Sequence, residues 1–166
     1  MYVKECEGCE EKIDDKFRIC EYSGFILNHA IQDKSKNRFP YELGHLVLMP
    51  RKRKESINGL KHATDTTNLT KSELQGICEL LPTILDTMKD VLPSIKGDGI
   101  ERIYLATFNE DEKWHFHIHL VPRYKCEPRR GTALLTPRVV PDEDIDQVVK
   151  EMKRKLGCNS QITNRG

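Results

Sequence analysis

Three histidines at alternate positions are the residues of this chain best suited to chemistry. His115, His117 and His119 are separated by single apolar residues, and further apolar residues follow them. Side chains of a β-strand alternate between its faces, so a strand over 114–123 would place the three imidazoles on one face and the apolar residues on the other. Imidazole can act as a nucleophile, an acid, a base or a metal ligand near neutral pH. The run therefore predicts a rigid row of titratable rings.

A structural role for the three histidines is the simplest alternative. A buried imidazole needs polar partners, because removing it from water without them costs free energy. Three rings side by side in a core would cost more than three apolar residues unless a ligand or polar groups compensated. We therefore expect the row to be functional.

Length and composition predict one globular domain over 1–166. Hydrophobic residues make up 37% of the chain and charged residues 32%, with a net charge of +1, which argues against disorder and against a membrane protein. The charge balance gives no reason to expect nucleic acid as a partner, and the short basic runs at 51–54 and 129–130 indicate solvated surface. The N-terminus lacks the apolar core of a signal peptide, so we expect a cytoplasmic protein without a membrane partner.

The six cysteines are expected to be reduced thiols in that compartment. Cys6 and Cys9 alone are close in sequence, which suggests a metal before a disulfide, although one such pair supplies only two of the four ligands of structural zinc. Cys78 lies among the apolar residues of a predicted helix and is expected in the core.

The elements that must position the histidines are short strands and two helices. Hydrophobic patterning predicts five strands, at 17–22, 25–29, 45–49, 100–108 and 114–123. The short connection at 109–113 makes the last two strands a hairpin, so this half of the sheet should be antiparallel. The fold class predicted from this pattern is α+β.

Two helices complete the predicted pattern. Thr70 and Glu73 can form a capping box at the start of a long helix whose apolar residues repeat with helical period as far as Leu92. Pro82 lies inside this helix and predicts a kink or two helices end to end. A second amphipathic helix is expected at about 142–156, with acidic residues in its first turn and basic residues in its last.

The histidine run resembles a known family signature. The residues at 115–121, His-Phe-His-Ile-His-Leu-Val, are similar to the motif of the histidine triad (HIT) nucleotide hydrolases and transferases, and Pro-Arg-Tyr at 122–124 resembles their dinucleoside polyphosphate branch. The segments 44–51 and 25–28 resemble the two family strands that precede the triad, and the Cys6–Cys9 pair resembles the one that opens many members. The resemblance implies one HIT-like domain: an antiparallel sheet of about five strands, a long helix packed on it and a C-terminal helix. Its core would cover about 6–124, with 125–166 as a C-terminal extension.

The resemblance implies covalent chemistry at the α-phosphate of a nucleotide. His117 would attack the phosphorus and form a nucleotidyl-histidine, which water or another acceptor then releases. His119 would hydrogen-bond a phosphate oxygen or the leaving group, and His115 would orient the rings or bind metal. Asn28 would hold the ribose hydroxyls and Asn109 the phosphate, although an asparagine that simply ends a strand remains the alternative for Asn28. The implied substrates are dinucleoside polyphosphates or nucleoside phosphoramidates, with adenine as the expected base.

The chain departs from the family pattern in two places. Many members have Gly-Gln and a small hydroxyl residue before the triad, whereas 111–114 here is Asp-Glu-Lys-Trp, so Lys113 or backbone amides would have to supply positive potential. Zinc-binding relatives also carry a histidine soon after the segment that matches Pro50. The chemistry needs no cofactor, and a structural zinc would use the ligands Cys6, Cys9 and His115, with His62 or His45 in place of the missing histidine.

Two other functions stay open at this point. The first is a metal-dependent hydrolase or oxygenase in which the three histidines are metal ligands, although no companion ligand motif adjoins them. The second is a non-catalytic nucleotide-binding protein that keeps the triad as a binding surface. The resemblance also implies a homodimer, formed through the long helix and the strand at 100–108.

Overall fold

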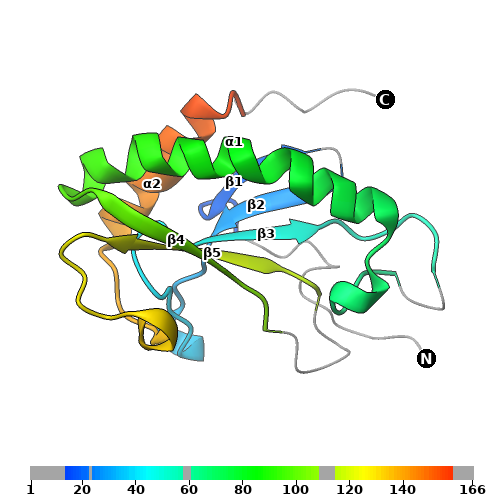
Figure 1. The fold of residues 1–166 in the computed structure, drawn as a ribbon, viewed down its shortest axis with the longest axis horizontal. Helices are drawn as coiled ribbons and strands as arrows, with labels where there is room; N and C mark the ends of the chain where they lie inside the picture. Colours follow the sequence, from blue (N-terminus) through cyan, green and yellow to red (C-terminus); the bar gives the residue numbers. More distant parts are fainter. Residues whose placement is uncertain (1–13, 23, 58–60, 109–114, 159–166) are drawn as a thin grey trace.

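The chain folds into a five-stranded antiparallel sheet with two helices on one of its faces (Figure 1). The computed structural model describes residues 14–22, 24–57, 61–108 and 115–158. The strand order is β1-β2-β3-β5-β4, with bounds Arg18–Tyr22 (β1), Phe25–His29 (β2), Leu46–Pro50 (β3), Ile100–Ala106 (β4) and Ile118–Tyr124 (β5). The helices are α1 (Lys71–Lys96) and α2 (Asp142–Lys155), and three short 3₁₀ turns are η1 (Lys34–Lys36), η2 (Thr66–Asn68) and η3 (Gly131–Leu135). The predicted α+β class and the β4–β5 hairpin are confirmed.

The two faces of the sheet differ in what covers them. Residues of one parity, such as Leu27, Leu48 and Leu120, are fully buried in the core beneath the helices. Residues of the other parity, such as Val47 and His119, are only partly buried. Because pleated strands send alternate side chains to opposite faces, the second set lines the face away from the helices. The site residues described below lie on this open face.

The long helix is continuous and packs closely on the sheet. Thr70 caps it and forms the predicted capping box with Glu73. Pro82 lies within a single helix of 26 residues, so two helices end to end are not formed. An interior proline costs about 3 kcal/mol, whereas each buried aliphatic side chain contributes roughly 1.5–3 kcal/mol, and five residues of this helix are buried. Gly76 allows the close approach, because a Cβ there would lie 2.4 Å from the Phe25 ring.

The histidine strand is shorter than the sequence predicts. β5 begins at Ile118, so His115 and His117 precede it, and β4 ends at Ala106. The reason is the loss of the neighbouring strand: β3 ends at Pro50, which has no N–H for a ladder. The Phe116 N–H donates instead to the Ala63 carbonyl at 2.7 Å. The backbone before β5 therefore turns from the sheet to the loop that precedes α1.

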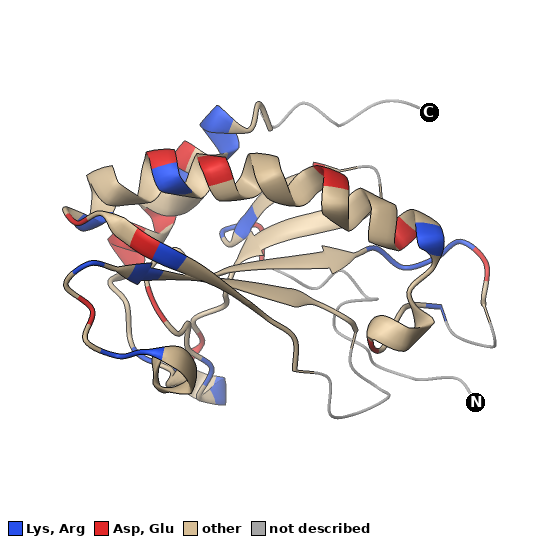
Figure 2. Ribbon diagram, in the orientation of Figure 1, with Lys and Arg blue, Asp and Glu red and all other residues tan. Residues whose placement is uncertain are grey.

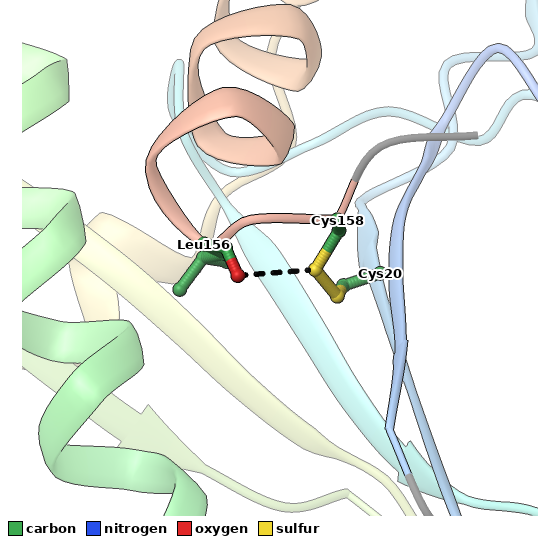
Figure 3. The surroundings of a disulfide bond; sticks show 3 residues. All are labelled: Cys20, Leu156 and Cys158. Carbon is green, nitrogen blue, oxygen red and sulfur yellow. Dashed lines mark hydrogen bonds between the residues drawn. A yellow bond between two sulfur atoms is a disulfide. The ribbon is translucent and has the colours of Figure 1, made fainter. Parts of the chain in front are cut away.

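Two expectations about cysteines are wrong. Cys20 of β1 and Cys158, just after α2, form a disulfide with Cα atoms 5.5 Å apart, whereas all six cysteines were expected to be reduced. Figure 3 shows this bond beside the carbonyl of Leu156, 3.6 Å from the Cys158 Sγ. The two residues are 138 positions apart, so no spacing argument could pair them. Cys78 is exposed, because it lies about 100° around the helix from the buried Ile77.

Residues of both charges are spread along α1 and α2 (Figure 2). Within the described ranges, no helix combines the length and the apolar character needed to cross a membrane.

Candidate active site

The open face of the sheet brings Asn28 and His119 into one row. In the strand registers Asn28 is paired with Val47, and Val47 with His119. Directly paired residues of antiparallel strands point to the same face. The two polar side chains therefore flank Val47, two strand spacings apart, which is roughly 10 Å.

His117, His119 and His45 form a cluster at one end of this row. The rings of His117 and His119 meet edge to face, with centroids 4.6 Å apart. His45, which directly precedes β3, lies on the other side of His119, with its Nε2 2.8 Å from the Nδ1 of His119. Tyr41 stacks on the His45 ring at 4.7 Å. Phe108 contacts the His119 ring, with centroids 5.5 Å apart.

The hydrogen bonds of the cluster fix where each ring carries its proton. The Tyr41 N–H donates to the Nδ1 of His45 at 3.1 Å, so a neutral His45 has its proton on Nε2 and donates it to the Nδ1 of His119. A neutral His119 then carries its own proton on Nε2. The Nδ1 of His117 lies 2.7 Å from the His115 carbonyl, which can only accept, so the Nε2 of His117 keeps its lone pair. One ring thus presents a lone pair and its neighbour an N–H.

Burial keeps the two supporting rings neutral. The pKa of His119 is lowered to about 4, first by burial and then by the neighbouring His117. The pKa of His45 lies well below its ordinary value for the same first reason, with further contributions from nearby histidines. Burial removes water that would stabilise the imidazolium, so the neutral ring is favoured. The tautomers derived above for His45 and His119 therefore apply at neutral pH.

Asn28 has the features of a ligand-binding amide. Its side chain is 2% exposed, and neither its Nδ2 nor its Oδ1 has a hydrogen-bond partner in the described part of the chain. Leaving a buried amide unsatisfied costs roughly 1–3 kcal/mol for each group. A hydrogen-bonding ligand on the open face would recover this cost. A side chain that merely ended a strand would be expected to bond a nearby backbone group.

Known structures share the fold of this chain. A Zn-bound histidine triad family protein from Mycobacterium smegmatis superposes with a TM-score of 0.60 at 18% identity, over 95% of this chain and 99% of its own. A diadenosine triphosphate hydrolase from Plasmodium falciparum gives 0.53 at 17% identity, over 87% and 79%. A hypothetical histidine triad nucleotide-binding protein from Sulfolobus tokodaii gives 0.56 at 16% identity, over 86% and 84%. The chain has the histidine triad fold. No family model and no curated protein matches the sequence.

Within the histidine triad fold, the first histidine of the triad lies apart from the other two. His115 stacks on His62, with ring centroids 4.8 Å apart and planes 19° from parallel. Both rings are buried. The pKa of His115 is lowered to about 4, mainly by burial and then by His62, and the pKa of His62 is lowered by burial and by Arg53 and Lys52. The three histidines therefore do not form one row over one cavity.

The structure assembles part of the predicted site and adds residues to it. His117, His119 and Asn28 share the open face, whereas Asn109, Cys6 and Cys9 lie outside the described residues. His45 was considered only as a zinc ligand, yet it contacts His119. Tyr41 was not predicted, because a residue in a polar loop four positions before a histidine shows no periodicity that would mark it.

Proposed function

We propose that this protein is a nucleotide hydrolase or transferase of the histidine triad type. It cleaves at the α-phosphate of a nucleoside phosphate, either a dinucleoside polyphosphate or a nucleoside phosphoramidate, through a nucleotidyl-histidine on His117. The observation that carries the proposal is the pair of adjacent rings with opposite roles, a lone pair on the Nε2 of His117 and an N–H on the Nε2 of His119. Nucleophilic catalysis on phosphorus needs both.

The first step transfers the nucleotidyl group to the enzyme. The lone pair of His117 Nε2 forms a bond to the α-phosphorus while the bond from phosphorus to the leaving group breaks. The electron pair of that bond leaves with the departing group, whose charge the His119 N–H stabilises. The His115 carbonyl accepts a hydrogen bond from the Nδ1–H of His117 and so stabilises the positive charge on the attacking ring. In an anhydride substrate the leaving group departs as a phosphate anion, whereas in a phosphoramidate the departing nitrogen takes a proton from solvent and leaves as an amine.

The second step restores the enzyme. Water, or another acceptor, forms a bond to the phosphorus and loses a proton to solvent, and the electron pair of the N–P bond returns to His117. Asn28 holds the ribose hydroxyls through its buried amide during both steps. Adenine is the base to test first, since no described contact distinguishes one base from another. Asn109, proposed as a phosphate ligand, lies outside the described residues.

A structural zinc fits the donor set next to this site. Cys6, Cys9, His62 and His115 would supply two sulfurs and two nitrogens, a common set for structural zinc. Two observations support His62 and His115 as members of this set: their rings are stacked, and burial lowers the pKa of both, which favours the neutral form that binds metal. His45, the alternative fourth ligand, is hydrogen-bonded to His119, which favours His62 as the fourth zinc ligand. In the described ranges no three metal-binding side chains gather, as two of the four donors lie outside them.

The stacking of His115 on His62 also weakens the alternative in which the triad itself is a catalytic metal centre. That function requires the three ring nitrogens to converge on one ion. Here His115 lies against a different loop, and the Nδ1 of His117 is held by a carbonyl.

A second copy of the chain is proposed as the partner at the β4 edge. β4 is a terminal strand of the sheet, and Leu105 and Phe108 are 50% and 38% exposed. Leu74 of α1 is 47% exposed. Exposed apolar residues at an open strand edge are a common site of association.

A cytoplasmic location remains a prediction.

Trapping the intermediate is the decisive experiment. The protein is mixed with diadenosine polyphosphate or with an adenosine phosphoramidate, quenched rapidly without acid and measured by intact-mass spectrometry. We expect an AMP adduct that maps to His117 and that is absent in His117→Gly. Turnover without any protein-bound nucleotide would refute the covalent route.

A further inference from the structure

The segment 40–45, which leads into β3, is held by a buried carboxylate. Glu42 is 2% exposed. Its Oε1 lies 3.3 Å from Lys96 Nζ, and its Oε2 lies 2.7 Å from Arg138 Nη1 and 3.2 Å from Arg129 Nη2. Three cations thus converge on one carboxylate. They come from the end of α1 and from the loop after β5, where Figure 2 shows residues of both charges.

The backbone of the same segment is fixed by hydrogen bonds on both sides. The Arg138 N–H donates to the Pro40 carbonyl at 2.8 Å, and the Ala30 N–H to the His45 carbonyl at 2.7 Å. The Tyr124 hydroxyl donates to the Leu43 carbonyl at 3.0 Å. In Figure 1 the loop after β5 lies on the side of the sheet away from α1, the same side as the segment it binds.

A second carboxylate serves as an internal comparison. Glu127 binds Arg129 at 2.9 Å and Arg138 at 3.0 Å, so it shares two of the cations, and its side chain also contacts that of Glu42. It lies in the same loop as these arginines, whereas Glu42 lies in the segment that leads to the site. Removing the charge of Glu127 leaves all three cations available to Glu42.

The position of this segment decides the tautomer of the site histidine. Tyr41 is the residue directly before Glu42, and its backbone N–H donates a hydrogen bond to the Nδ1 of His45. If the segment moves, that N–H no longer blocks Nδ1, and His45 is free to carry its proton there. The Nε2 of His45 would then accept from His119, and His119 would lose the Nε2–H that faces the substrate side.

We infer that Glu42 is a positioning residue that, through Tyr41 and His45, keeps the proton of His119 on Nε2. The inference rests on the proposed function, because it concerns the group that stabilises the leaving atom. Buried ion pairs add little stability relative to apolar packing, and fixing one geometry is a role in which they are better attested. The three-cation clamp on Glu42 has the form expected of such a device.

The proton positions are measured directly by nitrogen NMR of the histidine rings. In the wild type we expect His119 to be protonated on Nε2 and His45 on Nε2. In Glu42→Gln we expect a mixture of tautomers at both rings, and in Glu127→Gln the wild-type pattern. Arg138→Gln serves as a milder variant, because its side chain is 42% exposed and its loss removes the shortest contact with Glu42.

Turnover gives the second readout. A hydrogen-bond donor to the leaving atom raises kcat by about 10²–10³-fold, and this effect is largest when the leaving group is strongly basic. Glu42→Gln should therefore slow cleavage of an alkyl ester of AMP roughly tenfold more than cleavage of its nitrophenyl ester, while Glu127→Gln leaves this ratio unchanged. An unchanged tautomer pattern and an unchanged ratio in both Glu42→Gln and Arg138→Gln would overturn the inference. If no nucleotide is cleaved by any form, the proposed function fails, and the NMR pattern still decides the role of Glu42.

Discussion

Two groups of histidines lie next to each other in this fold and differ in what surrounds their nitrogens. In the cluster of His45, His117 and His119, backbone groups and ring nitrogens fix each tautomer, and the Nε2 atoms of His117 and His119 remain on the half-buried open face. In the pair of His62 and His115, the rings are buried and stacked on each other. His115 and His117, two positions apart in the sequence, thus have different surroundings. The difference arises where the backbone leaves the sheet, between Phe116 and Ile118.

The largest expected effect distinguishes His117 from His115. His117→Gly should lower kcat/KM for diadenosine polyphosphate by about 10⁴-fold or more, since it removes the nucleophile. Nucleotide binding should change little, because Asn28 and the rest of the open face remain. The measurement is steady-state turnover together with equilibrium binding of AMP.

The matched control for this prediction is His115→Asn. It keeps the backbone carbonyl that accepts from His117, so activity per folded molecule should fall by less than about tenfold. Equal losses in the two variants would remove the distinction between the cluster and the pair.

The sequence predicts the sheet and helices well because their signals are local. The boundaries at 25–29 and 142–156 match the observed elements within one residue, and the Thr70 capping box forms as predicted. The alternation of His117 and His119 with buried apolar residues is confirmed as well. Periodicity and capping depend only on neighbours in the chain, so a single sequence contains them.

The contacts that were missed are between distant segments. The stacking of His115 on His62, the contact of His45 with His119 and the disulfide between Cys20 and Cys158 all join residues far apart in the chain. The strand start at 118 was also missed, since it depends on where β3 ends. No local pattern records such pairings, and the ligand set of the proposed zinc site had to stay open for the same reason.

Zinc content provides the second test of the comparison. The purified protein should contain one zinc per chain, and His62→Asn should lose it and destabilise the fold by about 4 kcal/mol, as loss of a structural metal does. His45→Asn should keep the metal, because His45 belongs to the cluster. Elemental analysis and urea unfolding measure both quantities. Zinc that stays in His62→Asn and leaves in His45→Asn would reverse the assignment.

The pH dependence of stability tests whether the buried rings are neutral. His29 is fully buried and its pKa is lowered to about 4, chiefly by burial, with the Ala30 carbonyl opposing the shift. Between its unfolded pKa of 6.5 and its folded pKa, the unfolded chain binds a proton that the folded chain does not. Its contribution is therefore complete above pH 6.5 and is lost as the pH falls. This one residue should remove about 2 kcal/mol between about pH 7.5 and pH 5.

The contribution of His29 to the pH dependence of stability can be distinguished from that of the carboxylates. The pKa of Glu127 is held at about 2, first by its hydrogen bond to Arg129, so its contribution is lost only as the pH falls from about 4.5 toward 2. His29→Gln keeps an acceptor for the Gly44 N–H, which donates to His29 Nε2 at 3.2 Å. It should reduce the slope of the urea midpoint against pH above pH 5 by the share of one histidine, because His45, His115 and His119 also have lowered pKa values and keep their contributions. A slope unchanged by this substitution would mean that His29 is protonated in the folded protein.

The smallest effect is expected from a comparison of two side-chain amides, one with hydrogen-bond partners in the described structure and one without. Asn28→Leu should raise KM about tenfold through loss of the hydrogen bonds to substrate, yet raise the free energy of unfolding by about 1 kcal/mol, because an unpaired buried amide is removed. The amide of Gln32 is bonded to the Val140 backbone at 2.8 and 2.9 Å, so Gln32→Leu should lower stability and leave KM unchanged. The two variants have the same kind of substitution and opposite expected signs in stability. If Asn28→Leu also destabilises the protein, Asn28 has a structural partner and its assignment to substrate loses its main support.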